Sequence, residues 1–134
     1  MTTTVQSQGA TAVLNGKQLE KDGLDYLRTK EYEIKTNKRL YWSKTNYYIP
    51  DVILDDEIVI EFKFQQVSGS AQNKLSQAVA ELQWMSNTIG YKPVLVISGD
   101  KLMHVVNNDP AFKLVVMACP DVQIMTIQEF YSTF

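Results

Sequence analysis

Two charged side chains stand two positions apart in a segment whose pattern is that of a strand. Residues 58–65 alternate strictly, and Glu61 and Lys63 fall on the same side of that alternation. A further acid, Asp51, lies ten positions before Glu61 and directly after Pro50. Because buried strand faces usually exclude charge, this grouping indicates a place where chemistry occurs. The other interpretation is a pair of solvated charges on a strand.

The loop between two neighbouring strands decides whether Asp51 and Glu61 meet. A three-residue loop, 55–57, places Asp51 opposite Glu61 if the strands form a hairpin. A two-residue loop places Asp51 opposite Ile60 instead, on the other face of the sheet. The even spacing of positions 51 and 61 is therefore necessary for a carboxylate pair, and the sequence meets it.

The chemistry expected of such a pair is that of a hard metal ion. Two carboxylates that converge repel each other unless a proton or a cation lies between them. Oxygen ligands select Mg²⁺, Mn²⁺ or Ca²⁺ over zinc. A lysine beside the metal can orient or activate a water molecule and offset developing negative charge. Hydrolysis of a phosphodiester requires this combination of metal, positioned water and nearby cation.

The composition excludes several other classes of protein. The chain has 134 residues, enough for one domain, with one cysteine and one histidine, which excludes a disulfide framework and multi-His metal sites. A net charge of −2 argues against a basic nucleic-acid coat protein but permits a local basic face. The sequence contains no long apolar run and no signal-peptide pattern, so we expect a soluble, intracellular, cytoplasmic protein without a membrane partner.

The elements that must position these residues follow from periodicity and turn signals. The sequence predicts a single domain over 1–134, with residues 1–12 as a flexible tail and Asn15 as the N-cap of the first helix. Residues 111–117 fit either a helix or a strand. The predicted helices are 15–29, 71–88, 100–106 and a last turn at 127–131; the predicted strands are 32–36, 46–54, 58–65, 93–97 and 122–126, with a polar turn at 55–57 and a loop at 66–70. This order predicts an α/β fold in which helices pack on a mixed sheet.

The motif and the order of elements together resemble a known family. Pro50–Asp51 followed by Glu61–Phe62–Lys63 resembles the PD-(D/E)XK motif of the restriction-endonuclease-like nucleases. The predicted order, αβββαβ, is similar to the core of that family, and the resemblance covers roughly residues 15–98. Gln65 adds a similarity to the E-x-K-x-Q variant seen in many restriction and some homing endonucleases.

Two flanking segments are similar to the same family. Gly16 and Glu20 match a glycine, three residues and a glutamate in the first helix, and residues 69–74 resemble a loop and helix start that follows the motif. The resemblance implies a restriction-endonuclease-like core, a mixed central β-sheet flanked by helices.

The resemblance also implies roles for individual residues. Asp51, Glu61 and the carbonyl group of Phe62 would bind Mg²⁺, for which Mn²⁺ could substitute, and Lys63 would position or activate the attacking water. Gln65 and Glu20 would be supporting polar groups near the metal. Gly69, Ser70 and Lys74 would approach the phosphate backbone; independently, a glycine loop that opens a helix presents free N–H groups to an anion.

A basic and aromatic segment offers a second place for DNA. Residues 17–44 hold 8 of the 13 basic residues, so we expect DNA contacts from a set of cations and one tryptophan: Lys35, Lys38, Arg39, Trp42 and Lys44. The alternative is an edge hairpin protected by lysines. Trp84 is expected in the core or at a subunit interface rather than stacked on a base.

The function that these expectations favour is a metal-dependent DNA endonuclease of restriction, homing or phage-nuclease type. The alternatives are a Holliday-junction-resolvase-like nuclease, a non-cleaving DNA-binding or assembly module on the same fold, and an unrelated α/β interaction protein that matches the motif by chance. Because cutting both strands of a duplex usually takes two active sites, a homodimer or homotetramer is expected.

Overall fold

The centre of the protein is a mixed β-sheet. A computed structural model describes residues 8–65 and 71–134, and within them five strands form this sheet in the order β1-β4-β5-β6-β7. The three strands on one side are antiparallel, and β5, β6 and β7 are parallel. The bounds are Ile34–Lys35 for β1, Val52–Leu54 for β4, Ile58–Phe64 for β5, Lys92–Ser98 for β6 and Gln123–Thr126 for β7. The predicted mixed sheet is therefore confirmed.

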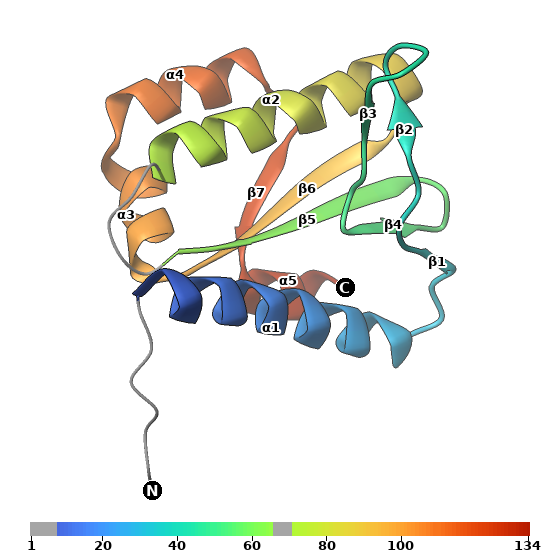
Figure 1. Ribbon diagram of the computed structural model, residues 1–134, viewed down its shortest axis with the longest axis horizontal. Helices are drawn as coiled ribbons and strands as arrows, with labels where there is room; N and C mark the ends of the chain where they lie inside the picture. Colours follow the sequence, from blue (N-terminus) through green and yellow to red (C-terminus); the bar gives the residue numbers. More distant parts are fainter. Residues whose placement is uncertain (1–7, 66–70) are drawn as a thin grey trace, which may run out of the picture.

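Helices cover both faces of this sheet. On one face lie α1 (Gln8–Arg28) and α5 (Ile127–Thr133), and on the other lie α2 (Ala71–Ile89), α3 (Asp100–Asn108) and α4 (Pro110–Ala118) (Figure 1). The buried residues form two clusters that the sheet separates. Successive residues of β5 alternate between them, because strand side chains point to opposite faces: Val59 packs with α2, and Ile60 packs with α1.

The first helix begins earlier than predicted. It starts at Gln8, so residues 8–12 are helical rather than part of a tail, and Asn15 lies inside the helix rather than at its N-cap. The sequence Ala10-Thr11-Ala12-Val13-Leu14 contains good helix formers, so the helix continues before Asn15.

Gly23 weakens the helical pattern, and the packing of the helix explains why glycine stands there. A Cβ at this position would lie 2.6 Å from ring carbons of Phe62.

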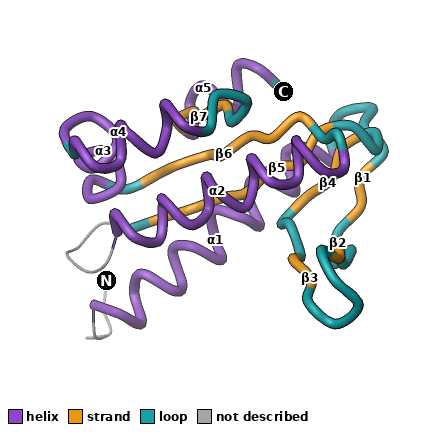
Figure 2. The backbone as a smooth tube through the Cα atoms, turned by 90° about the horizontal axis from the view of Figure 1, so that it is seen from above, coloured by secondary structure: helices purple, strands orange, loops and turns teal. Residues whose placement is uncertain are grey.

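A small second hairpin is present, which the sequence offered only as an alternative for the basic segment. Strands β2 (Leu40–Tyr41) and β3 (Tyr47–Tyr48) pair antiparallel and project beside the sheet (Figure 2). The predicted strand 46–54 is wrong as one element, because it divides into β3 and β4 around Ile49–Pro50–Asp51. Proline has no N–H to donate to a ladder, which favours a break at this point. The hairpin rests on the core through Leu40 and Tyr48.

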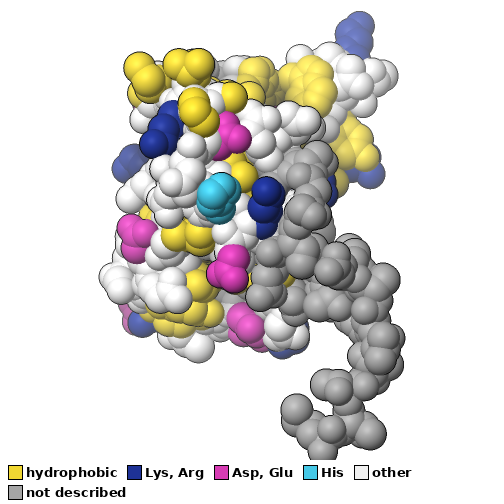
Figure 3. All heavy atoms as spheres, turned by 90° about the vertical axis from the view of Figure 1, so that its left-hand side faces the viewer, with side chains coloured by type: hydrophobic (Ala, Val, Ile, Leu, Met, Phe, Trp, Pro, Cys, Tyr) yellow, Lys and Arg dark blue, Asp and Glu magenta, His cyan; other side chains and the backbone are white. Residues whose placement is uncertain are grey.

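The remaining elements agree with the sequence in type and approximate position. The undecided segment 111–117 belongs to helix α4. On this helix Leu114 and Met117 expose 67% and 76% of their area, which is unusual for large apolar side chains. Figure 3 shows the side of the molecule that carries α3 and α4, where apolar side chains gather along one edge. Among the described helices, none combines the length and the apolar character that crossing a membrane would require.

Candidate functional site

The turn between β4 and β5 sets the register of the candidate site. The two strands pair Val52 with Ile60 and Leu54 with Ile58, so the turn is the three-residue loop 55–57. Asp55 and Asp56 adopt left-handed backbone angles, φ 53° and 54°, which the short polar side chains of Asp and Asn tolerate better than most. The two-residue alternative is therefore excluded, and Asp51 comes to lie opposite Glu61.

Two hydrogen bonds lock the carboxylates of Asp51 and Glu61 side by side. The backbone N–H of Asp51 donates to Oε1 of Glu61 at 2.8 Å, and the backbone N–H of Phe62 donates to Oδ2 of Asp51, also at 2.8 Å. Each carboxylate is thus held by a backbone group of the other strand. The predicted meeting of these two residues is confirmed, and their orientation depends on the backbone rather than on a flexible contact.

Burial makes this pair electrostatically costly. Glu61 is only 4% exposed, and burial raises the pKa of its carboxyl above the usual range, an effect that the charge of Asp51 increases. Burial likewise raises the pKa of Asp51; the Phe62 N–H lowers it, and the charge of Glu20 raises it. Two acids with raised pKa values in one place are the signature of a site that a cation or a proton would stabilise.

A lysine completes this arrangement from the same strand. Nζ of Lys63 lies 3.8 Å from Oε2 of Glu61, and the Lys63 side chain is 42% exposed whereas that of Glu61 is 5% exposed. The ammonium group therefore connects the buried pair with solvent. It opposes the rise in pKa of both carboxyls, but burial outweighs it.

The two supporting residues that the resemblance implies, Glu20 and Gln65, lie on different elements. Glu20, on α1, is near enough for its charge to act on Asp51. Gln65 is buried at the end of β5, on the strand face that carries Glu61 and Lys63. The backbone carbonyl oxygen of Gln65 accepts hydrogen bonds from the backbone N–H groups of Lys101 and Leu102. These bonds connect the end of β5 with the start of α3.

One neighbour of the pair, Tyr48, was missed by sequence reasoning. Its hydroxyl group makes a hydrogen-bonding contact with Glu61 that lowers the pKa of the acid, and burial raises the pKa of Tyr48 itself. The signal available in the sequence was its position, two residues before Pro50, in a segment rich in tyrosine. The contact depends on the turn between β3 and β4, which periodicity does not reveal.

The predicted DNA-contacting residues fall into separate groups. Gly69 and Ser70 lie outside the described residues, and Lys74 is exposed near the start of α2. Lys35 and Lys38 form ion pairs with Asp56 at 3.2 and 3.8 Å, beside the turn at the far end of β5 from Lys63. Their position favours the interpretation of lysines that protect the edge strand β1.

The other members of the basic segment belong to the β2–β3 hairpin. The Arg39 guanidinium lies over the ring of Tyr47, 4.5 Å from its centroid, and Lys44 is exposed in the loop. Trp42 is 51% exposed and contacts Trp84 of α2 edge to face, with ring centroids 5.9 Å apart. Trp84 is partly buried and packs against the core cluster, which agrees with one of its two predicted positions, the core, but its ring also contacts the exposed Trp42 of the hairpin.

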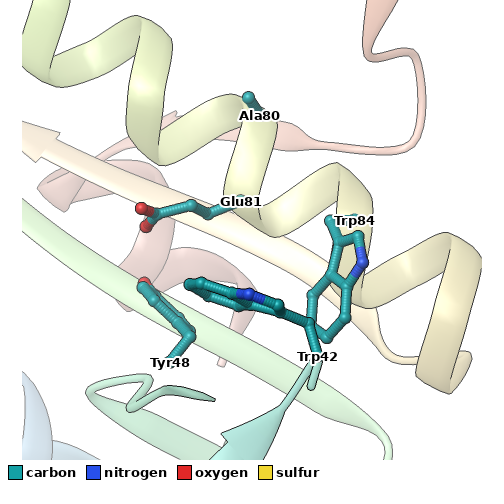
Figure 4. Close-up of a pocket in the computed structure, with 5 residues that line it drawn as sticks. All are labelled: Trp42, Tyr48, Ala80, Glu81 and Trp84. Carbon is teal, nitrogen blue, oxygen red and sulfur yellow. The ribbon is translucent and has the colours of Figure 1, made fainter. Parts of the chain in front are cut away.

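A cavity of about 430 Å³ opens between this hairpin and α2. Figure 4 shows the side chains that line it, three of them aromatic: Trp42, Tyr48, Ala80, Glu81 and Trp84. Because Tyr48 also contacts Glu61, the cavity and the carboxylate pair share a wall.

The donor set at the pair suits a metal held by few protein ligands. Among the described residues, no three or more His, Cys, Asp or Glu side chains gather as a metal-binding cluster. Asp51 and Glu61 therefore offer two carboxylates. Backbone and water oxygens would have to complete the coordination shell, an arrangement that is common for Mg²⁺.

Comparisons of the chain with family models, with curated proteins and with solved structures find no match.

Proposed function

We propose that this protein is a metal-dependent DNA endonuclease that hydrolyses phosphodiester bonds. The observation that carries the proposal is the pair of buried, mutually locked carboxylates, Asp51 and Glu61, with the Lys63 ammonium 3.8 Å from Glu61. Burying two neighbouring carboxylates costs free energy, which a bound divalent ion would recover, and the half-exposed Lys63 ammonium beside them would bind a phosphate.

The arrangement of the elements supports the same proposal. Helix α1, strands β1, β4 and β5, helix α2 and strand β6 follow one another in the order αβββαβ, with the β2–β3 hairpin inserted. We infer a restriction-endonuclease-like core from this order, from the change from antiparallel to parallel pairing at β5, and from the position of the motif on β4 and β5.

Mg²⁺, or Mn²⁺ in its place, fits the donor set of this site. Asp51, Glu61 and the carbonyl oxygen of Phe62 would hold the ion, and carboxylate oxygens are the ligands that it prefers. When bound, the ion polarises the phosphate and favours ionisation of water. It would also offset the effect of burial and of the neighbouring Asp51 charge, which together raise the pKa of Glu61.

Side chains and backbone groups of the chain would position the attacking water and stabilise the phosphate. Lys63 extends from the buried pair toward solvent, where its ammonium group would position the attacking water and stabilise negative charge on the phosphate. The N–H of Phe62 holds Asp51 in place throughout. Glu20 would orient water beside Asp51, since its charge already acts there.

A cleavage assay tests the proposal. Linear duplex and four-way-junction DNA would be incubated with the protein over a Mg²⁺ titration, beside Asp51→Asn and Glu61→Gln variants, which keep the acceptors for the backbone hydrogen bonds. We expect Mg²⁺-dependent cleavage by the unmodified protein and none by the variants. Preference for the junction would assign a resolvase-like activity. DNA binding without cleavage, or cleavage that survives both substitutions, would overturn the proposal.

An association of two copies agrees with this function. Cutting both strands of a duplex takes two sites, and the exposed apolar side chains of α4, Leu114 and Met117, offer a surface for a second copy. Sedimentation of the unmodified protein and a Leu114→Glu/Met117→Glu variant would test it. A monomer at micromolar concentration in both cases would remove this part of the proposal.

A further inference from the structure

The side chains that line the cavity between the hairpin and α2 suit a planar aromatic ligand. The rings of Trp42 and Trp84 meet at an interplanar angle of 80°, so they form a corner rather than a cage closed on several sides. Trp42 is half-exposed, which leaves ring surface open to a ligand, and Tyr48 closes another side (Figure 4). A planar ligand can stack on one wall of such a corner while its edge abuts the other.

One carboxylate gives this cavity its polar selectivity. Glu81 lines it, and Oε1 of Glu81 accepts a hydrogen bond from Nε2 of Gln77 at 2.9 Å. None of the ion pairs in the described part of the chain includes Glu81. A carboxylate without a cationic partner, facing an aromatic cavity, selects a ligand that brings N–H donors.

The cavity also has a defined position relative to the carboxylate pair. Its Tyr48 wall contacts Glu61. Burial raises the pKa of Tyr48, and the charges of Glu61 and, to a smaller extent, Glu81 raise it further, so both acids act on the same hydroxyl group. Figure 4 shows the Glu81 carboxylate pointing toward that hydroxyl. A group bound in the cavity is therefore a neighbour of whatever binds at Asp51 and Glu61.

We propose that this cavity receives one unstacked nucleobase of the bound DNA, next to the phosphate that is cleaved, and that Glu81 favours guanine. The proposal rests on the proposed nuclease function. Guanine presents a ring N–H and an exocyclic amino group side by side, both donors to a carboxylate. Adenine and cytosine place an acceptor nitrogen beside their amino group, and thymine has no amino group. Glu81 therefore discriminates among bases, while Trp42 and Trp84 supply the stacking surface.

Binding of single-stranded oligonucleotides in Ca²⁺, with EDTA-free buffer and no Mg²⁺, tests the assignment. The strands would be thymine 12-mers that carry one central guanine, one central inosine, which lacks the exocyclic amino group, or neither. We expect about 10-fold tighter binding of the guanine strand than of the thymine strand, with inosine between them, and quenching of tryptophan fluorescence. Equal binding of all three strands would overturn the proposal.

Variants separate the walls of the cavity from the rest of the hairpin. Trp42→Ala should lose both the quenching and the preference for guanine, whereas Glu81→Gln should lose the preference and keep the quenching. Trp42 is the better test of stacking than Trp84, because Trp84 packs against the core and its loss could unfold the protein. Tyr41→Ala is the matched control, since Tyr41 is 50% exposed on the same hairpin and does not line the cavity. A loss of preference in Tyr41→Ala as large as in Trp42→Ala would overturn the assignment.

Parallel measurements distinguish this proposal from the nuclease proposal. Mg²⁺-dependent cleavage without any guanine preference leaves the nuclease and removes the base site. Guanine preference without cleavage leaves the base site and removes the nuclease. Absence of DNA binding removes both. Quenching by choline at lower concentrations than by deoxyguanosine monophosphate would assign the cavity to a cationic ligand and overturn the base site.

Discussion

Replacing Asp51 by Asn should stabilise the protein when no divalent ion is present. Burial, supported by the charge of Glu20, raises the pKa of Asp51 from 3.8 to about 6, and Glu61 shifts in the same direction. The folded protein therefore binds more protons than the unfolded chain between about pH 4 and pH 7, and its free energy of unfolding falls as the pH rises through that range. Each unit of pKa shift corresponds to about 1.4 kcal/mol.

The pKa shift of about two units corresponds to an expected gain of about 3 kcal/mol at pH 8, and the gain should vanish near pH 2.5, where the carboxyl is protonated in both states. Asn keeps an acceptor for the N–H of Phe62, so the hydrogen bond that holds position 51 is not lost. For a domain of this size the gain corresponds to a rise in Tm of roughly 11 °C. Thermal and urea denaturation at both pH values, in EDTA, would measure it.

A matched variant and a metal titration sharpen this test. Asp56→Asn should change stability in the opposite direction at neutral pH, because Lys35 and Lys38 hold the pKa of the exposed Asp56 carboxyl below its usual range. Mg²⁺ should raise the Tm of the unmodified protein and leave that of Asp51→Asn unchanged, because the ion would stabilise only the protein that binds it. A loss of stability in Asp51→Asn at pH 8 in EDTA would refute the reasoning, as would an equal response of both proteins to Mg²⁺.

Three further predictions concern the lysine, the hairpin and the first helix. Lys63→Met should lower the single-turnover cleavage rate by roughly 10²-fold while binding of DNA in Ca²⁺ changes little, and a rate within about threefold of the unmodified protein would remove Lys63 from catalysis. Arg39→Gln/Lys44→Gln should flatten the salt dependence of DNA binding by about one unit of slope for each phosphate that the variant no longer neutralises, whereas Lys35→Gln/Lys38→Gln, whose cations already have acidic partners, should leave the slope nearly unchanged. Gly23→Ala should lower the free energy of unfolding in urea by about 1–3 kcal/mol, because its Cβ would overlap the ring of Phe62. Gly16→Ala should be neutral or stabilising, because nothing lies within 4 Å of the added Cβ. The reverse order of stabilities would contradict the packing of α1 on β5.

The parts of the site that could be predicted from the sequence are those set by local geometry. The alternation of β5 and the length of the 55–57 loop fix which side chains of one hairpin face each other, and both are visible in the residues. The start of α1 at Gln8 was missed because a good N-cap residue, Asn15, also occurs inside helices.

The parts that could not be predicted depend on contacts between distant elements. Strands β2 and β3 contain two residues each, so pairing rather than periodicity defines them. The meeting of Trp42 with Trp84 brings together residues that are far apart in the sequence, from a hairpin and a helix. Neither the cavity nor the contact of Tyr48 with Glu61 could be inferred before that arrangement was known.

The hydrogen bonds that join Asp51, Glu61 and Phe62 have a consequence for the order of folding. All three residues lie in one hairpin, which on its own can close in microseconds, whereas the parallel pairing of β5 with β6 has to wait for α2 to cross between them. We therefore expect the two acids to meet while water still surrounds them and weakens their repulsion, and the energetic cost to arise later, when α2 covers that face. We accordingly expect docking of α2 to be the step at which a divalent ion bound by the two acids would assist folding. Stopped-flow refolding should show acceleration by Mg²⁺ in the unmodified protein but not in Asp51→Asn, and equal acceleration in both would place the ion's effect elsewhere.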